Sequence, residues 1–402
     1  MVHETDWIKR GPHTHHHVFE RLSKNTSIEI IVLDYDSDKL MRSRSLYIKK
    51  HTYQNIDRAI KNSKVKIIRT AHIQVPYIRR ISSMVSNFIQ MMSIIRKNKP
   101  DLIVSFSIAN GFLSLLLSKI FKIPYIFYVI DHYHTLVPIK IAQPVAKIFY
   151  RFSIKYADQV IVVTKLLQNF VLNELKVKKD IKILLNGISL ENTIVNEEKL
   201  KNLKLKLGIA ETDFVLFFMG YLYDFAGLKE IIDYYHNDIK NKKYNFKFLI
   251  VGDGGVYQLL KKHIKDISAD WVILAGRIPF FDITEYIELA DLCLLSFDIN
   301  EITDKITPGK IVEYMAMKKP VLSNNLPAVV IELGKNNGVV FAKNQKDLIR
   351  KIGTLSSQKA KLKEIGLDGF NFVKEKYNWS NIINDLKRII IDLIRKKRKK
   401  ND

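Results

Sequence analysis

Short apolar runs alternate with amphipathic stretches along this chain, and the alternation restarts halfway. The runs are rich in β-branched and aromatic residues, which is typical of buried parallel strands. Because parallel strands are joined by crossover connections, usually helices, the alternation predicts two doubly wound α/β domains. The predicted strands are Ser27–Leu33, Val65–Ile68, Leu102–Phe106, Tyr125–Ile130 and Gln159–Val163, then Phe214–Met219, Phe246–Val251, Trp271–Leu274, Leu292–Leu295 and Pro320–Leu322.

A polar stretch rich in Lys and Glu, Glu191–Lys206, separates the two series. It predicts one domain over residues 1–190 and a second over residues 191–376, followed by a closing helix and basic tail at 377–402. A chain of 402 residues suits two domains of this size. With 47% apolar residues it can bury both cores, which excludes global disorder.

The charge balance is strongly basic, with 65 Lys+Arg against 41 Asp+Glu and a net charge of +24. Such an excess favours anionic partners: nucleic acid, acidic lipid headgroups or phosphorylated substrates. No recognised nucleic-acid module accompanies the charge, so nucleic acid is the least favoured of these. The single cysteine, Cys293, excludes a disulfide framework and a Cys-based zinc site, and it favours a reducing, cytoplasmic compartment.

The amino-terminal segment is rich in His and charge, which does not resemble a secretory leader. The longest uncharged run, Leu102–Ser118, is interpreted as a strand, a loop and a buried helix rather than a membrane span, because Asn110-Gly111 divides it. Only Met1-Val2-His3 precedes the first loop. Either the first strand of the domain is very short, or the true start lies upstream of Met1.

The segment 307–321 is the most informative part of the sequence about a binding site. Thr307 and Pro308 suit an N-cap and a first helical position, so a helix is predicted to begin there. Free N–H groups and the dipole at such a helix start suit a phosphate. Lys310 and Glu313 share a helix face, where the cation can neutralise a diphosphate and the carboxylate can accept hydrogen bonds from a ribose diol. An ordinary helix start with a surface Lys–Glu pair is the alternative.

This segment resembles the nucleotide-binding helix of the family 4, or group 1, retaining glycosyltransferases, in which Pro-x-Lys-(Leu/Ile)-x-Glu-Tyr-Met-Ala precedes Lys-Pro-Val. Further motifs match in order along essentially the whole chain, and their order is more specific than any one of them. They are Arg10–His13, Asn186–Ile188, Phe218–Gly220, Val251–Gly254, Val272–Arg277, Ala290–Ser296 and Tyr377-x-Trp379. The resemblance implies the GT-B fold: two Rossmann-like domains facing a cleft, with a carboxyl-terminal crossover helix.

By this resemblance the donor is a nucleotide-sugar, and no metal or other cofactor is required. The residues implied in donor binding are Gly11, Gly220, Lys229, Gly252, Gly254, Arg277, Thr307, Pro308, Gly309, Lys310 and Glu313. The candidate catalytic residues are His13, which the resemblance places near the cleft between the domains, and Asp131 and His134, which it places beside the donor sugar.

Two departures from the family pattern bear on the donor. The first carboxylate of the family's Glu-x7-Glu pair falls on Lys305, and the second falls on Glu313. The family's Gly-Arg-x4-Lys-Gly, whose cations hold the diphosphate, corresponds to Gly220–Gly227, which has neither cation. Lys310 is the best substitute, followed by Lys229 and Arg277.

The candidates in the first domain have alternative explanations. His13, with its neighbours His15–His17, could contact substrate, hold a metal or serve structure, although adjacent helical residues point in different directions. Asp131 and His134 follow the strand Tyr125–Ile130, at the end where doubly wound domains gather catalytic residues. Asp131 could also cap local backbone.

Two other patterns are interpreted as carrying no site. Asp34-Tyr35-Asp36 is expected to be a pair of solvated turn carboxylates. Gly252-x-Gly254-Gly255 lacks the full dinucleotide fingerprint and its distal acid.

Six cations, Arg395–Lys400, follow the amphipathic helix Trp379–Ile394. The predicted helix Arg79–Arg96 also has cations at both ends, and its spacing places Ile81, Val85, Phe88, Met92 and Ile95 along one face. Both suit an anionic membrane surface, with a solvated tail and a core-facing helix as the alternative. The expected function is transfer of a sugar, with retention, to a glycan or lipid-diphosphate-linked acceptor in surface polysaccharide or glycoprotein glycan synthesis, on the cytoplasmic face of the cell membrane. A sugar-nucleotide epimerase or a catalytically silent partner subunit of the same fold remains open.

Overall fold

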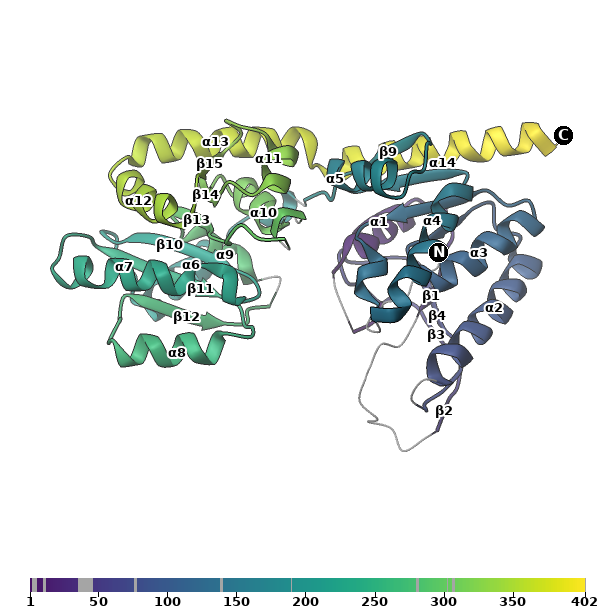
Figure 1. Ribbon diagram of the computed structural model, residues 1–402, viewed down its shortest axis with the longest axis horizontal. Helices are drawn as coiled ribbons and strands as arrows, with labels where there is room; N and C mark the ends of the chain where they lie inside the picture. Colours follow the sequence, from purple (N-terminus) through teal and green to yellow (C-terminus); the bar gives the residue numbers. More distant parts are fainter. Residues whose placement is uncertain are drawn as a thin grey trace. The chain divides into compact units, whose positions relative to one another are not determined.

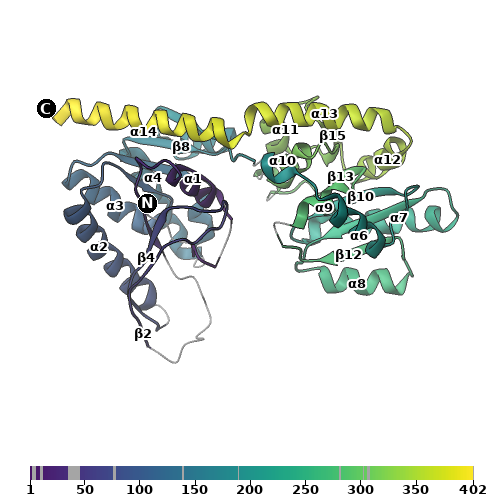
Figure 2. The same ribbon diagram turned by 180° about the vertical axis from the view of Figure 1, so that it is seen from behind.

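The computed structural model describes residues 1, 6–9, 12–34, 46–75, 78–137, 140–188, 190–279, 282–301, 303–305 and 308–401. The chain forms two compact units, shown in Figure 1 and from behind in Figure 2: unit 1 is Met1–Leu185 with Ser380–Asp402, and unit 2 is Asn186–Trp379. The boundary between the units after Leu185 lies close to the predicted domain boundary after residue 190. The predicted closing helix belongs to unit 1 from Ser380 onward.

Unit 1 is a mixed α/β unit whose strands are mostly parallel. Its sheets have the orders β1-β4-β3 and β6-β7-β8-β9, with a small antiparallel pair β2-β5. Its elements are α1 (Thr14–Ser23), β1 (Ile30–Asp34), β2 (Tyr47–Ile48), β3 (His51–Tyr53), β4 (Val65–Arg69), β5 (His72–Ile73), α2 (Ile78–Asn98), β6 (Ile103–Ser105), α3 (Ala109–Ile120), β7 (Tyr125–Val129), η1 (Tyr133–Leu136), η2 (Lys140–Ala142), α4 (Gln143–Tyr156), β8 (Gln159–Val162), α5 (Lys165–Asn169), η3 (Phe170–Glu174), β9 (Ile181–Ile183) and most of α14 (Trp379–Asn401).

Unit 2 is built on a six-stranded parallel sheet of order β12-β11-β10-β13-β14-β15. Its strands are β10 (Phe214–Met219), β11 (Phe246–Val251), β12 (Val272–Gly276), β13 (Leu292–Leu295), β14 (Val321–Asn324) and β15 (Val339–Ala342). Its helices are η4 (Leu190–Thr193), α6 (Glu197–Leu207), η5 (Asp224–Ala226), α7 (Leu228–Lys240), α8 (Tyr257–Asp266), α9 (Ile283–Glu288), η7 (Thr303–Lys305), α10 (Lys310–Ala316), α11 (Pro327–Leu333), α12 (Gln345–Ser356) and α13 (Lys359–Lys376).

The α/β class and every predicted strand are confirmed, with ends shifted by a few residues. The buried runs formed strands because their side chains fill both faces of the sheet; successive side chains of β10, from Phe214 to Met219, are all buried. The strands that the pattern missed, among them β9 and β15, are short or only partly buried, and so they lack a continuous apolar run.

The predicted helix Arg79–Arg96 is confirmed as α2, but its orientation differs from the expected one. Ile81 and Val85, which the periodicity placed along one face with Ile95, are exposed. The buried face begins instead with Ser83 and Asn87, because the Asn87 side-chain oxygen accepts a hydrogen bond of 2.7 Å from the Thr70 hydroxyl. In the parts of the chain that the structure describes, no helix combines the length and apolarity needed to cross a membrane.

Candidate functional site

The carboxyl ends of β10, β11 and β12 meet at one edge of the unit 2 sheet and are followed or closed by glycines. Gly252 has φ of 134°, and a Cβ there would lie 1.9 Å from the carbonyl oxygen of Gly220. At Gly254 a Cβ would lie 2.4 Å from the backbone nitrogen of Leu222. Only glycine permits these approaches, so this edge presents backbone rather than side chains.

The strand order of unit 2 reverses between β10 and β13, because chain order runs outward from β10 on one side and from β13 on the other. In an open α/β sheet, ligands bind outside the carboxyl ends of the strands at such a switch point. Phe218 lies near the end of β10, and Phe297 follows β13. These two residues therefore mark the switch point of unit 2.

The ammonium of Lys310 lies at this point. Its Nζ is 3.9 Å from the ring centroid of Phe218 and 4.4 Å from that of Phe297. It is also beside Gly220, where a Cβ would lie 3.1 Å from it. The Nζ atom is buried and has no hydrogen-bond partner among the described residues. A buried cation held only by ring faces is poorly compensated.

Burial shifts the pKa values of both charged groups on α10. It lowers the pKa of Lys310 to about 7, and the charge of Glu313 opposes this shift only in part. Burial raises the pKa of Glu313, against the attraction of Lys310. Burial thus favours the neutral form of each group.

Tyr314 fixes α10 to the sheet. Its buried hydroxyl accepts a hydrogen bond of 2.9 Å from the Met219 N–H at the end of β10. The helix begins at Lys310 with Gly309 as its N-cap, so the predicted start at Pro308 is two residues early. Thr307 lies outside the described residues. Glu313 is one turn after Lys310 and remains partly exposed.

Tyr221 takes the position of one missing cation and Ala226 that of the other, and aromatic rings line the segment between them. In the run Gly220–Gly227 the rings of Tyr221 and Tyr223 lie 4.6 Å apart, and Tyr223 stacks on Phe225 at 4.6 Å. Phe225 in turn meets Phe297 edge to face at 5.5 Å. The rings thus lead from exposed Tyr221 to the buried surroundings of Lys310.

The two other candidate cations lie apart from this contact. Lys229 is exposed on α7 and pairs with Asp233 at 2.5 Å. Arg277 is exposed directly after Gly276, the last residue of β12, and so belongs to the same sheet edge as Gly252. Gly11 lies outside the described residues. The donor-binding roles of all these residues stay predictions.

In unit 1 the histidines pack together at the start of α1. The His15 and His16 ring centroids are 4.3 Å apart, and Trp7 lies 4.3 Å from His16. The Nδ1 of His16 accepts a hydrogen bond of 3.0 Å from the backbone N–H of His13, so its Nε2–H donates to the Trp7 carbonyl at 3.0 Å. Burial lowers the pKa of His16 to about 3.

His13 itself is exposed, with its ring 5.9 Å from that of His16. Across the described ranges, no three His, Cys, Asp or Glu side chains are placed to hold a metal ion. The substrate role of His13 and the independence from metal remain predictions.

Asp131 and His134 lie in one segment after β7. The ring of His134 stacks on Phe170 at 5.6 Å, and its buried Nδ1 has no hydrogen-bond partner among the described residues. Burial, followed by the charge of Lys147, lowers the pKa of His134. Asp131 is exposed, and its carboxylate accepts the backbone N–H of His132 at 2.7 Å. This local cap leaves the predicted sugar contact untested.

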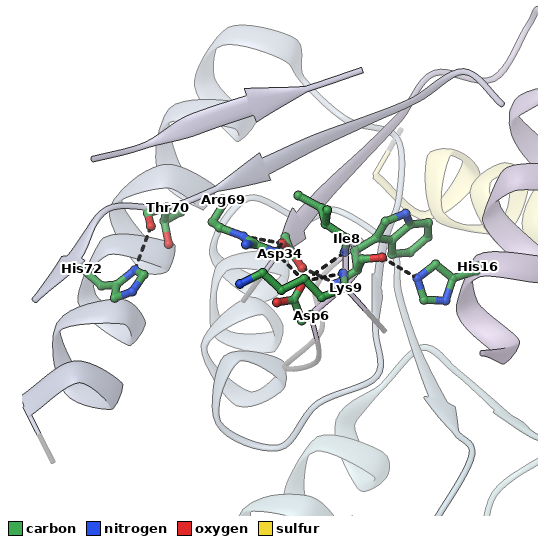
Figure 3. Close-up of polar contacts among 9 residues, drawn as sticks. Asp6, Ile8, Lys9, His16, Asp34, Arg69, Thr70 and His72 are labelled. Carbon is green, nitrogen blue, oxygen red and sulfur yellow. Dashed lines mark hydrogen bonds and ion pairs between the residues drawn. The ribbon is translucent and has the colours of Figure 1, made fainter. Parts of the chain in front are cut away.

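The expectation for Asp34 is wrong. It is the last residue of β1 and is buried, and its side chain accepts a hydrogen bond of 2.7 Å from Arg69 Nε (Figure 3). Its other oxygen accepts the Trp7 N–H at 2.7 Å, and Arg69 also pairs with Asp6 at 2.6 Å. Asp36 lies outside the described residues. Asp34 is a structural carboxylate and not a solvated one.

Both halves of the chain match known protein families. Residues 213–358 match the family model described as Glycosyl transferases group 1, and residues 51–192 match the model described as Glycosyltransferase Family 4. The chain belongs to the group 1 glycosyltransferases. An uncharacterized glycosyltransferase of Methanocaldococcus jannaschii, MJ1069, is 25% identical over 244 residues, and the match spans 60% of each chain.

Solved structures show that the whole chain has the fold of this group. Anabaena HepE in complex with UDP has a TM-score of 0.69 and 15% identity, covering 97% of this chain and 99% of that one. A glycosyltransferase from Rickettsia africae has a TM-score of 0.69 and 16% identity, covering 98% of each chain. The predicted GT-B class is thereby confirmed.

Sequence reasoning did not foresee the aromatic surroundings of Lys310 in this group 1 glycosyltransferase. Phe218 and Phe297 are far apart in sequence, so their contact with one ammonium had no local signal. The row of rings did have a local signal in the sequence. Residues two apart share a face of an extended segment, and this spacing separates Tyr221, Tyr223 and Phe225.

Proposed function

We propose that this chain transfers a sugar from a nucleoside diphosphate sugar, with retention, to a glycan or lipid-diphosphate-linked acceptor of surface polysaccharide or glycoprotein glycan synthesis. The buried ammonium of Lys310 at the switch point supports this most strongly. A diphosphate supplies the anionic hydrogen-bond partner that Lys310 Nζ lacks among the described residues. The HepE structures contain UDP and UDP-glucose, which favours a donor of this class.

In the proposed reaction the donor's diphosphate leaves with a growing negative charge. Lys310 stabilises that charge, and the diphosphate raises the pKa of Lys310 again, so the ammonium is fully protonated when it is needed. The backbone edge at Gly252 and Gly254 lets the phosphates approach closely. Glu313, one turn along, accepts hydrogen bonds from the ribose diol.

The activity is tested with mixtures of nucleotide-sugars, with and without lipid-diphosphate acceptors, followed by mass spectrometry. Glycosylated acceptor, formed only when an acceptor is present, supports the proposal. Isomerised donor without acceptor would indicate an epimerase, and donor binding without turnover would indicate a silent partner subunit; either result contradicts it. Lys310→Met is the matched variant, because it removes the ammonium from a site whose other contacts are apolar.

We also propose that unit 1 rests on the anionic inner surface of the cell membrane through α2, α3 and α4. None of these helices contains Asp or Glu, and α3 packs against both of the others. Large apolar side chains are exposed on each, including Ile81, Ile89, Ile120, Ile148 and Phe152. Exposed apolar side chains interleaved with cations suit a membrane surface.

The basic tail contributes less than the sequence suggested. Lys397 pairs with Asp158 at 3.2 Å, and Arg398 pairs with Asp101 at 2.7 Å, so two of its cations already have protein partners.

Binding to vesicles containing anionic lipid tests the surface. Replacing both Ile148 and Phe152 by Glu is expected to weaken binding by at least about 10-fold, since two apolar side chains lose their burial. The control is Leu259→Glu, which changes an exposed apolar residue on α8 of unit 2. Equal partitioning of all three proteins would contradict the membrane surface.

A further inference from the structure

Lysines from separate segments gather at the amino edge of the unit 1 sheet, where β7 and β8 begin. Asp158, the residue before β8, accepts a hydrogen bond of 2.9 Å from the backbone N–H of Tyr125 with one carboxylate oxygen. Its other oxygen pairs with Lys119, in the last turn of α3, and with Lys397 of α14, each at 3.2 Å. Two ammonium groups from different helices therefore share one carboxylate oxygen.

Lys179 adds a third cation from the segment before β9. Its Nζ donates to the Ala157 carbonyl and, at 3.3 Å, to the Lys155 carbonyl, so it caps the carboxyl end of α4. Burial lowers the pKa of Lys179, while the charge of Asp158 opposes this shift and the charge of Lys119 adds to it. Lys179 is thus close enough to Asp158 and Lys119 to interact with both charges.

The positive charge of this lysine cluster exceeds the negative charge of its protein partner. Lys179 is used by the carbonyls that end α4, and the ion pairs of the described residues give Lys119 and Lys397 one carboxylate between them. Both ammonium groups lie 3.2 Å from the same oxygen, so they repel each other across at most twice that distance. An anion that accepts hydrogen bonds from both would relieve this repulsion, and the several oxygens of a phosphate group suit that role.

The lysine cluster is accessible from solvent and borders an apolar surface. The side chains of Lys119 and Lys397 are 41% and 21% exposed, so an anion can reach them. On α3, Lys119 lies within one turn of Leu116 and Ile120, which are both exposed. A phosphate site bordered by exposed apolar side chains fits a phospholipid better than it fits a free anion.

We propose that Lys119, Lys179 and Lys397 bind the phosphate group of an anionic membrane lipid. This inference rests on the proposed membrane surface of unit 1 and names the headgroup contact of that surface. The lysine cluster is separate from the candidate catalytic residues of this unit, because β7 begins beside it at Tyr125 and ends before Asp131, about 13 Å away along the strand.

The test measures binding to phosphatidylcholine vesicles with and without phosphatidylglycerol. Lys119→Met is expected to weaken binding to the anionic vesicles by at least about 10-fold. Lys97→Met is the matched control, since it removes a lysine from the last turn of the neighbouring helix α2. It should cost about 5-fold or less, the contribution of one cation near an anionic membrane. Lys119→Arg keeps the charge and should restore most of the affinity.

A local signal shows whether the lipid phosphate reaches the lysine cluster. The backbone N–H of Tyr125 donates to Asp158, so its NMR resonance reports on that carboxylate. Soluble dihexanoyl phosphatidylglycerol should shift this resonance in the unaltered chain, and the shift should be lost in Lys119→Met at an unchanged melting temperature. Inorganic phosphate should need at least about 10-fold higher concentration for the same shift, because it lacks the apolar contacts.

Three results would overturn the proposal. Equal losses for Lys119→Met and Lys97→Met would show a diffuse attraction without a site. An equal response to inorganic phosphate and to the lipid would assign the lysine cluster to a soluble anion. Absence of vesicle binding by the unaltered chain would remove the membrane surface as well, so failure of the surface and failure of the lysine site are distinguishable.

Discussion

Arg69 in unit 1 and Lys310 in unit 2 are both buried cations, but their surroundings differ. Arg69 donates hydrogen bonds to Asp34 and Asp6. Lys310 lies against two aromatic rings, and its Nζ has no hydrogen-bond partner among the described residues. A buried charge whose partners come from the fold holds the fold together, whereas one without such partners is available to a ligand. The following variants test this contrast.

The largest effect is expected from Asp34→Ala. It leaves the buried Arg69 with its ion pair to Asp6 but without Asp34, and it removes the acceptor of the Trp7 N–H. Breaking a buried ion pair destabilises by about 3–5 kcal/mol, so the urea unfolding midpoint should fall strongly. A loss below about 1 kcal/mol would show that the Arg69 cluster does not hold unit 1.

Lys310→Met should weaken ligand binding without lowering stability. It removes a buried ammonium and keeps an apolar side chain of similar length, so stability should stay equal or rise. Affinity for UDP, measured by calorimetry, should fall by about 1.5–3 kcal/mol, the value of a charged hydrogen bond. Lys243→Met is the control, because Lys243 is exposed and pairs with Asp238 at 3.0 Å. A lowered melting temperature with unchanged affinity would make Lys310 structural.

A smaller effect is expected from Glu313→Gln, which retains one acceptor and the side-chain shape. UDP affinity should fall by about 0.5–1.5 kcal/mol, as for a neutral hydrogen bond replacing a charged one. Affinity for 2′-deoxy-UDP should change less, because that ligand lacks half of the ribose diol. An equal loss for both nucleotides would remove the ribose from the role of Glu313.

The sequence predicted the strands and the α10 segment because these depend on local pattern. It failed at Asp34 and at the buried face of α2, where distant partners, Arg69 and Thr70, decide which residues are buried. The rings of Phe218 and Phe297 around Lys310 were missed for the same reason. Side-chain partners from separate strands are set by tertiary packing and have no signal at either position.

Proton uptake during UDP binding tests the role of Lys310 most directly. With a pKa of about 7 in the free protein, Lys310 is mostly neutral at pH 8. A neighbouring diphosphate raises that pKa, so binding should draw a proton from the buffer. Calorimetry at pH 8 in buffers of different ionisation enthalpy should show close to one proton taken up per UDP, and none for Lys310→Met. Binding with no proton uptake in either protein would contradict a diphosphate at Lys310.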